Sequence, residues 1–336
     1  MGKIERLKSG TYRTRVYIGQ NSLGKPVYKS FTDTDKNRLR QTAADYKRNH
    51  GTSGTKFGNQ TLGNAMESYI SGKKPVLSPS TIRGYTAAQK VFKTEFGAFC
   101  DKKLYNIDEM AFQTVVNQMY TTRSAKTVIN YCGFVNTVMK ANRCQELKIT
   151  LPPKTPRRTN IPDAEKMREI TRAAEGTRLD IPIHLAIMGL RRSEICALKN
   201  DDLEGNVLCV HRAAVYNEDG EVVNKEYPKT PGSFRYVRLP DTLAKKIRDS
   251  GEITKMKPNN LTDAFRRFIR SNGFPYMRLH DCRHFMASYL HEQGVTDAEI
   301  MQMGGWKTDH VMKNVYRHSL ATDEKAKEIA NKYSEF

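Results

Sequence analysis

Hydrophobic and polar positions change their spacing along the chain, and the first stretch predicts strands. Within residues 1–55, "TYRTRVYIG" and "PVYKSF" alternate basic or polar residues with β-formers. "QNSLGK" between them carries the residue types of a hairpin turn. "DKNRLRQTAADYKRN" then predicts a helix that begins at Asp35. We therefore expect a small sheet of two or three strands, taken as three, with one helix.

Apolar residues recur at helical spacing throughout residues 60–150. "TLGNAMESYIS", "SPSTIRGYTAAQKVFKTEFG", "DEMAFQTVVNQMYTT" and "SAKTVINYCGFVNTVMKANRC" each show the pattern. Ser78 or Ser80 and Ser124 are suitable N-caps. The stretch predicts an all-α bundle of four or five helices. Its basic side chains could face phosphate or simply be solvated, and the sequence does not separate these readings for Arg83, Lys90, Lys93, Arg123 and Lys126.

Residues 160–336 mix both periodicities. "GNVLCVHRAAVYNEDG", "EVVNKEYPK" and "FRYVRLP" predict a three-stranded meander, with "NEDG" as its first turn and "TPGS" as its second. Helices flank it, and a run of helices is expected at 261–272, 282–293, 297–303, 309–317 and 322–333. Residues 160–336 are thus predicted to be mixed α+β, mainly α.

Two stretches have the composition of linkers. "GTSGTKFGNQT" (51–61) is rich in Gly, Ser and Thr, and "LPPKTPRRTNIP" (151–162) is rich in Pro and basic residues. They divide the 336 residues into 1–55, 60–150 and 160–336. We expect a multidomain protein.

The charge balance points to a polyanionic partner. The chain has 56 Lys and Arg against 36 Asp and Glu, a net charge of +20. Residues 1–58 hold 13 basic and 4 acidic side chains, so 13 minus 4 leaves +9 there. Such an excess favours nucleic-acid binding over a protein that is merely basic. A basic strand face of the N-terminal sheet could enter a DNA groove or could be solvated.

The remaining composition suggests a cytosolic protein without a membrane partner. The six scattered cysteines form no CxxC pair and fit reduced thiols. No signal-peptide core or membrane-spanning apolar run is evident. A Gly-rich phosphate loop, an HExxH motif and a carboxylate cluster for metal are also missing. If the protein acts on phosphate, we expect no cofactor, no ATP and no metal.

Four short stretches carry candidate chemistry. In "MGLRRSEICALKNDDL", Gly189 ends one helix and Arg191 begins the next, where a guanidinium and free backbone donors make a phosphate seat. The alternative is a surface Arg191 paired with Glu194. In "YPKTPGSFRYVRLP", Lys229 lies near a hairpin tip, where it could give a proton to a leaving oxygen or only contact solvent.

The other two stretches lie further along the chain. In "RLHDCRHFMASYLHEQG", His280 and Arg283 are three apart at a helix start and share a face, while His284 is expected to point elsewhere. In "MQMGGWKTDHVMKNVYRHS", Trp306 offers an indole N–H or core packing, after a Gly304-Gly305 turn that aims it inward. Tyr316 is a possible nucleophile, activated by a base or by cations.

In this order these residues resemble the tyrosine recombinases, the phage and conjugative-transposon integrases typified by lambda integrase. "GLRRSEICALKNDDL" is similar to the first arginine motif, "PKTPGSFRYVRLP" to the lysine hairpin, "LHDCRHFMAS" to His-x-x-Arg and "GGWKTDHVMKNVYRHS" to the nucleophile stretch. Trp306 stands where most members have histidine. The resemblance is strong over 160–320. It extends in outline to an arm-type DNA-binding domain (1–55) and a SAM-like core-type DNA-binding domain (60–150).

The resemblance implies a mechanism with Tyr316 as nucleophile and a 3′-phosphotyrosyl intermediate. Arg191, Lys229, His280, Arg283 and Trp306 would complete the catalytic set, with Glu194 supporting them. It also implies a homotetramer on double-stranded DNA at core and arm sites, in the bacterial cytoplasm and associated with the nucleoid. Excisionase or DNA-bending accessory proteins could join it. The tail "ATDEKAKEIANKYSEF" would form a helix that docks on a neighbouring protomer or packs in cis.

Two other functions share the same features. A topoisomerase IB-like enzyme would cut and reseal one strand, but a separate basic N-terminal domain suits the bridging of two DNA sites better. A non-catalytic DNA-binding regulator would not need all six residues. The sequence leaves open the target sites and whether the mobile element is a phage or a transposon.

Overall fold

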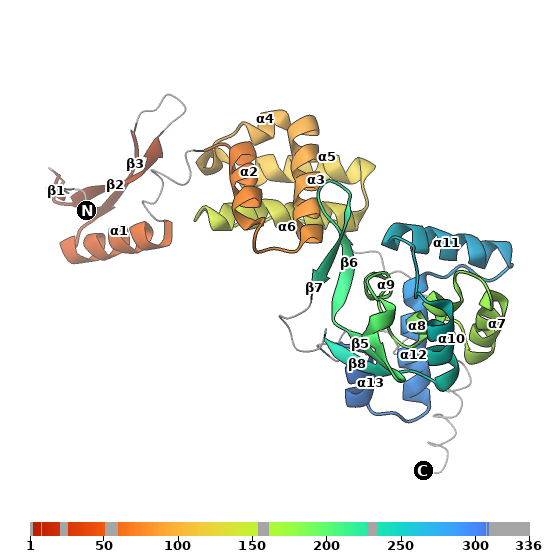
Figure 1. The fold of residues 1–336 in the computed structure, drawn as a ribbon. Helices are drawn as coiled ribbons and strands as arrows, with labels where there is room; N and C mark the ends of the chain where they lie inside the picture. Colours follow the sequence, from red (N-terminus) through yellow and green to blue (C-terminus); the bar gives the residue numbers. More distant parts are fainter. Residues whose placement is uncertain are drawn as a thin grey trace, which may run out of the picture. The chain divides into compact units, whose positions relative to one another are not determined.

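The computed structural model describes residues 3–7, 9–20, 26–50, 60–153, 161–226, 234–306 and 308. The chain divides into two compact units, Met1–Pro156 and Arg157–Phe336. Helices predominate in the described residues, and three small sheets accompany them (Figure 1). The protein is therefore a helix-rich mixture of helices and small sheets. Within its described part, no helix is long and apolar enough to cross a membrane.

The first unit begins with an antiparallel sheet of order β1-β2-β3. Its strands are Glu5–Arg6, Tyr12–Gln20 and Pro26–Asp33, and helix α1 follows at Lys36–His50. The Asp35 carboxylate caps α1 by accepting hydrogen bonds from the backbone of Asn37 and Arg38, both at 2.7 Å. The strands and the helix start agree with the predicted secondary structure, and residues 21–25 of the predicted turn lie outside the described residues.

The sheet has one covered face and one open face. Thr14 and Val16 on β2 are buried, as is Leu39 on α1. The intervening β2 residues Arg13, Arg15 and Tyr17 point to the opposite face, because side chains alternate along a strand. This open face therefore carries positive charge and an aromatic ring.

Helices make up the rest of the first unit. They are α2 Leu62–Lys73, α3 Pro79–Glu95, α4 Gly97–Cys100, the 3-10 turn η2 Leu104–Asn106, α5 Glu109–Thr122 and α6 Ala125–Ala141. Asp108 and Ser124 cap α5 and α6 through hydrogen bonds to backbone N–H groups. Ser78 occupies the N-cap position of α3 without a side-chain bond, and Pro79 begins the helix. The predicted helices and the Ser124 cap are confirmed.

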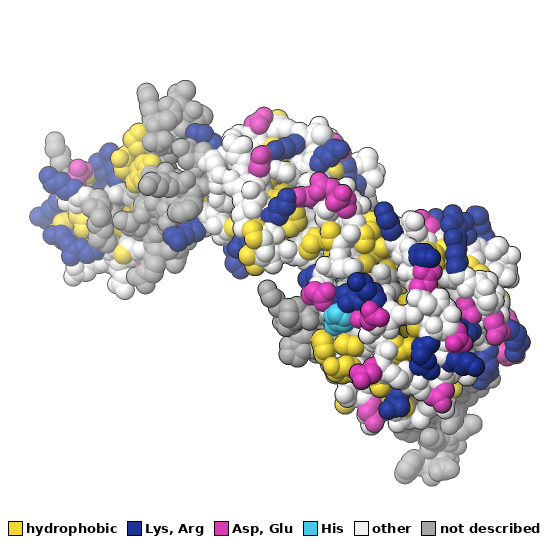
Figure 2. All heavy atoms as spheres, viewed as in Figure 1, with side chains coloured by type: hydrophobic (Ala, Val, Ile, Leu, Met, Phe, Trp, Pro, Cys, Tyr) yellow, Lys and Arg dark blue, Asp and Glu magenta, His cyan; other side chains and the backbone are white. Residues whose placement is uncertain are grey.

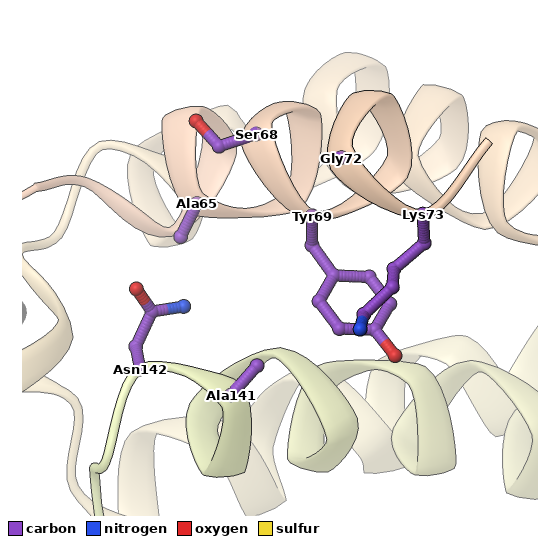
Figure 3. A pocket seen from close by; sticks show the side chains of 7 residues that line it. All are labelled: Ala65, Ser68, Tyr69, Gly72, Lys73, Ala141 and Asn142. Carbon is purple, nitrogen blue, oxygen red and sulfur yellow. The ribbon is translucent and has the colours of Figure 1, made fainter. Parts of the chain in front are cut away.

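An apolar core holds these helices together. Phe92, Phe112 and Phe134 are completely or almost completely buried in it. A shallow groove of about 240 Å³ remains between α2 and α6, lined by small side chains together with Tyr69, Lys73 and Asn142 (Figure 3). Its lining contains neither arginine nor histidine, so the groove lacks the side chains of the predicted phosphate chemistry.

The second unit packs helices around two small sheets. Its helices are α7 Ala164–Ala174, α8 Asp180–Ile187, α9 Arg192–Ile195, α10 Asp241–Ser250, α11 Pro258–Ser271, α12 Leu279–Glu292 and α13 Asp297–Gly304. The 3-10 turn η3 Asn200–Asp202 precedes β4 Leu203–Glu204, β5 Val207–Val210, β6 Arg212–Tyr216, β7 Val222–Glu226 and β8 Arg235–Arg238.

The strands do not form the predicted meander. The first predicted strand breaks at His211, and its halves join different sheets: β5 lies between β4 and β8, whereas β6 pairs with β7. Figure 1 shows β6 and β7 as a separate two-stranded ribbon. The "NEDG" turn is confirmed, because the Asn217 carbonyl accepts from Gly220 N at 3.2 Å and Gly220 has φ +81°. The predicted second turn, in residues 227–233, lies outside the described residues.

Helix α12 starts three residues before the predicted position. Asp281 at the third helical position accepts a hydrogen bond from the Arg278 backbone at 2.7 Å, and the Arg278 guanidinium binds the same carboxylate. This reciprocal cap fixes the start at Leu279. Helix α11 also starts three residues before its predicted position, whereas α13 matches its prediction to within one residue. The helices predicted at 309–317 and 322–333 lie outside the described residues.

Candidate active site

The junction between α8 and α9 places the first arginine. Gly189 has φ +90°, and a Cβ there would lie 2.3 Å from the Met286 Cε atom, so the turn needs glycine. Arg191 follows as the N-cap of α9, as predicted. Its guanidinium donates to the Glu194 Oε1 atom at 2.7 Å and to the Gly305 carbonyl at 2.8 Å. The Arg191 side chain remains one-third exposed, so a ligand can reach it while it is held in place.

Glu194 is completely buried and lies between two arginines. Its carboxylate also accepts from the Arg191 backbone N–H at 2.8 Å and from the two Nη atoms of Arg235 at 2.8 and 3.2 Å. Burial raises the pKa of Glu194, but hydrogen bonding and charge from Arg235 and then the charge of Arg191 outweigh it and hold the pKa below its usual value. Glu194 is therefore an anion that binds Arg191, the pairing that the sequence analysis gave as the alternative for this arginine.

Arg283 on α12 lies in the interior, with 1% of its surface exposed. Its Nη1 atom donates to the Gly304 carbonyl at 2.5 Å and also to the Gly189 carbonyl. Arg283 thus connects the turn before Arg191 to the turn before Trp306. A phosphate could reach this guanidinium only if a covering side chain moved.

The covering side chain is Trp306. The Cζ atom of Arg283 lies 3.7 Å from the centroid of the Trp306 ring, a cation–π contact. Trp306 also packs in an apolar cluster with Met286, Ala287 and Ile300. The predicted glycine turn is present: Gly305 has φ +66°, and a Cβ on Gly304 would lie 1.9 Å from the indole. Trp306 is thus packed in a core, which was one of its two predicted roles. The same packing places its ring against Arg283.

His280 lies one turn before Arg283, and its ring contacts that of His284, with centroids 4.6 Å apart. The prediction that His284 points elsewhere is wrong, because residues four apart on a helix are neighbours. His280 is exposed at the surface, yet surrounding protein removes much of its hydration. This desolvation and the positive charge of His284 and Arg283 lower the pKa of His280 to about 4. His280 is therefore neutral near pH 7 and can accept a proton.

Two predicted site residues lie outside the described residues. Lys229 belongs to the connection between β7 and β8, strands that belong to different sheets. Tyr316 follows the last described position, residue 308. The roles of both remain predictions. Among the predicted site residues that are described, hydrogen bonds and ring contacts join four at α9, α12 and the end of α13: Arg191, Glu194, Arg283 and Trp306. His280 lies one turn before Arg283 on α12.

Arg235 is a member of this cluster that the sequence did not single out. It lies on β8, six residues after Lys229, and only 6% of its surface is exposed. The available signal was its position on the inward side of "FRYVRLP", between the exposed Phe234 and Tyr236. Strand periodicity predicts an apolar residue at an inward-facing position. An arginine at such a position is only a weak indication of a functional role.

The site therefore combines positively charged arginines with a neutral histidine, and Arg191 and His280 are its members that reach the surface. The described residues contain no group of three His, Cys, Asp or Glu side chains that could bind a metal ion. Burial raises the pKa of Cys196, near Arg191 in the chain, to about 12, so this thiol is not an activated nucleophile. The cluster can bind an oxyanion through Arg191 and exchange a proton through His280.

The chain is similar to known proteins over most of its length. Residues 163–323 match the phage integrase family. A tyrosine recombinase XerC-like protein of Caldanaerobacter subterraneus subsp. tengcongensis is 25% identical over 374 aligned positions, which cover 94% of this chain and 95% of that protein.

Solved structures share the fold. The Tn1549 transposon integrase in complex with transposon right end DNA superposes with a TM-score of 0.66 at 14% identity, over 82% of this chain and 100% of that one. A lambda integrase tetramer bound to a Holliday junction gives 0.58 at 16% identity, over 93% and 94%.

The matches to the phage integrase family and to the XerC-like recombinase show an enzyme that cleaves and rejoins DNA strands. The chain is a tyrosine recombinase.

Proposed function

We propose that this chain is the integrase of a mobile element and joins DNA through Tyr316. The tyrosyl oxygen attacks a backbone phosphorus, the bond from phosphorus to the 5′ oxygen breaks, and a 3′-phosphotyrosyl bond forms. His280 accepts the tyrosyl proton, and Lys229 gives a proton to the departing 5′ oxygen. A second DNA end reverses the step, so no energy source beyond the original phosphodiester is needed.

The observation that carries this proposal is the joining of Arg191, Arg283 and Trp306 through the Gly189 and Gly304-Gly305 turns. In the proposed mechanism Arg191 binds a non-bridging oxygen. Trp306 shifts when DNA enters, which exposes Arg283 to the second oxygen and directs the indole N–H to the phosphate. Each preorganised donor of this kind contributes on the order of 10²–10³ in rate.

The proposed arm-type domain is 1–55, and the proposed core-type domain is 60–150. Arg13 on the open sheet face already binds Glu5, so Arg15 is the basic side chain there that supports the first assignment, beside Tyr17. Figure 2 shows Lys and Arg side chains spread over this part of the chain. In the helical part, Lys93 and Arg123 bind the carboxylates of Glu67 and Glu95, so charge pairing already accounts for these two. Exposed Lys90 and Lys126 are better candidates for phosphate contacts.

We further propose a homotetramer on DNA, by analogy with the lambda integrase tetramer on a Holliday junction. The tail after Tyr316 would dock on the neighbouring protomer. An excisionase or a DNA-bending protein would favour one direction of recombination.

A nicked DNA substrate tests the chemistry. Its sequence is taken from the junctions of the element that carries the gene, and loss of the short strand after cleavage traps the covalent adduct. We expect the wild-type chain to form an adduct stable in SDS and Tyr316→Phe to form none. Tyr276→Phe is the matched control, because Tyr276 is an exposed tyrosine of the same unit and should be dispensable. Absence of an adduct with wild type, or its persistence in Tyr316→Phe, would overturn the proposal.

The DNA-binding interpretation of the charge has its own test. If phosphate contacts dominate, the logarithm of the association constant falls linearly with the logarithm of salt concentration. Filter binding or fluorescence anisotropy between low and physiological salt measures the slope. A flat response would contradict the proposed role of the basic residues.

A further inference from the structure

The buried guanidinium of Arg235 contacts two parts of the cluster at once. Its Nη atoms bind both oxygens of Glu194, and its Nε atom donates to the Met303 carbonyl at 2.9 Å. Met303 lies directly before the Gly304-Gly305 turn that positions Trp306. Arg235 itself is the first residue of β8, which follows the segment that contains Lys229. One side chain therefore links three of the motifs.

The charge balance around Glu194 explains why a second arginine matters. Glu194 also binds Arg191, and a buried carboxylate with one arginine partner would cancel the charge of that partner. With both Arg191 and Arg235 present, two positive charges face one negative charge, and the group keeps a net charge of +1. Since Arg191 is the exposed member, this surplus charge is offered at the surface.

We propose that Arg235 is a positioning residue that neutralises Glu194, so that Arg191 stays held by the carboxylate yet keeps its charge for the DNA phosphate. The inference rests on the proposed function, because it needs Arg191 to bind a phosphate. Arg235 itself, with 6% of its surface exposed, acts through Glu194 and the Met303 carbonyl.

A structural role alone makes a different prediction from this electrostatic role. Arg235→Met removes the charge and leaves Glu194 to neutralise Arg191, so we expect adduct formation on the nicked substrate to slow on the order of 100-fold, as for loss of one oxyanion donor. In the double variant Glu194→Gln/Arg235→Met, Arg191 regains its charge. The double variant should then be faster than Arg235→Met by on the order of tenfold, since a glutamine at position 194 has no charge to offset that of Arg191.

Two further variants keep the test decisive if Arg235→Met unfolds. Arg235→Lys keeps the charge but loses the two-pronged contact, and it should retain more activity than Arg235→Met. Arg212→Met is the matched control, because Arg212 is a largely buried arginine of the same unit that binds Asp202, outside the Glu194 cluster. The thermal midpoint of each variant is measured beside its rate, and rates are compared below the lowest midpoint.

The outcomes separate the two proposals. If wild type forms the Tyr316-dependent adduct and Arg235→Met matches its rate, the positioning role is wrong while the proposed function stands. If Arg235→Met is slow but Glu194→Gln/Arg235→Met is no faster, Arg235 does not act by neutralising Glu194, and the inference is also overturned. If wild type forms no adduct, the proposed function fails, and the inference that rests on it fails too.

Discussion

The helical part of the first unit and the second unit keep their charges in different places. Between residues 60 and 153, the buried side chains are apolar, and the ion pairs Lys93–Glu67 and Arg123–Glu95 lie toward solvent. In the second unit, buried charged side chains lie in the interior, and within the described residues they are Asp180, Glu194, Asp202, Arg235, Asp281 and Arg283.

This difference separates a scaffold from a reaction centre. Burying a charge costs several kcal/mol unless partners compensate for it, and apolar residues of similar size often give equal or better stability. The helical part obtains its stability from burial of aromatic rings and from capped helix ends. Asp180, Asp202 and Asp281 have ionic partners elsewhere in the second unit. The ionic contacts of Glu194 lie beside Arg191, which fits a site that must hold positive charge ready for an anionic ligand.

The largest effect is expected at the buried carboxylate. Glu194→Ala leaves Arg191 and Arg235 without their shared anion, so the second unit should lose about 3–5 kcal/mol of stability. The fluorescence of Trp306, the single tryptophan, reports unfolding of this unit in a denaturant titration. Lys93→Met, which breaks a surface pair of the first unit, is the control and should leave the Trp306 transition unchanged. A loss below about 1 kcal/mol in Glu194→Ala would mean that the buried charges are not essential partners.

A core substitution in the helical part should act through packing alone. Met119 is completely buried, and Met119→Ala should destabilise its unit by about 3 kcal/mol through lost contacts and a cavity. Far-UV circular dichroism follows the helices of both units, while Trp306 fluorescence follows the second unit alone, so Met119→Ala should shift only the part of the helical transition that Trp306 does not report. An equal shift of both transitions would show that the two units unfold together, which would weaken the comparison.

Substitution of Gly304, two residues before Trp306, is expected to have an intermediate effect on stability. Gly304→Ala places a methyl group where the indole lies, so we expect a loss of about 1–3 kcal/mol from overpacking and a red-shifted Trp306 emission. Gly133→Ala, in helix α6 with no neighbouring atom within 4 Å of the new Cβ, is the matched control. It should raise stability by roughly 0.5–1 kcal/mol, because alanine suits a helix better. Unchanged emission in Gly304→Ala would contradict the close packing of indole and glycine.

The smallest effect concerns pH. The pKa of His280 is lowered from 6.5 to about 4 in the folded protein, so the unfolded chain takes up this proton first as the pH falls. The lowered pKa of His280 therefore leaves the free energy of unfolding unchanged above pH 6.5. It reduces this free energy progressively between pH 6.5 and 4, and by a constant amount below pH 4. Because the side chain is exposed, we expect the total to stay under about 1 kcal/mol. In His280→Gln, thermal midpoints between pH 7 and 4.5 should fall less steeply than in wild type, and parallel curves would refute this.

Local structure followed from local sequence. The caps at Asp35 and Ser124, the glycine turn at Asn217–Gly220 and the helical periodicity of residues 60–150 need only neighbouring residues, so their elements could be predicted. The cluster of Arg191, Glu194, Arg283 and Trp306 was reached through motif resemblance, because nothing local distinguishes these side chains from surface residues.

Long-range pairing decided the rest. The sequence by itself determined which segments are helices and strands and which residue types could bind and transfer a phosphate. Only the tertiary structure decided that β8 pairs with β5 rather than β7, since strand partners depend on packing between distant segments. The same packing buries Arg235 against Glu194 and covers Arg283 with Trp306, because a buried charge is tolerated only where distant segments supply its partners.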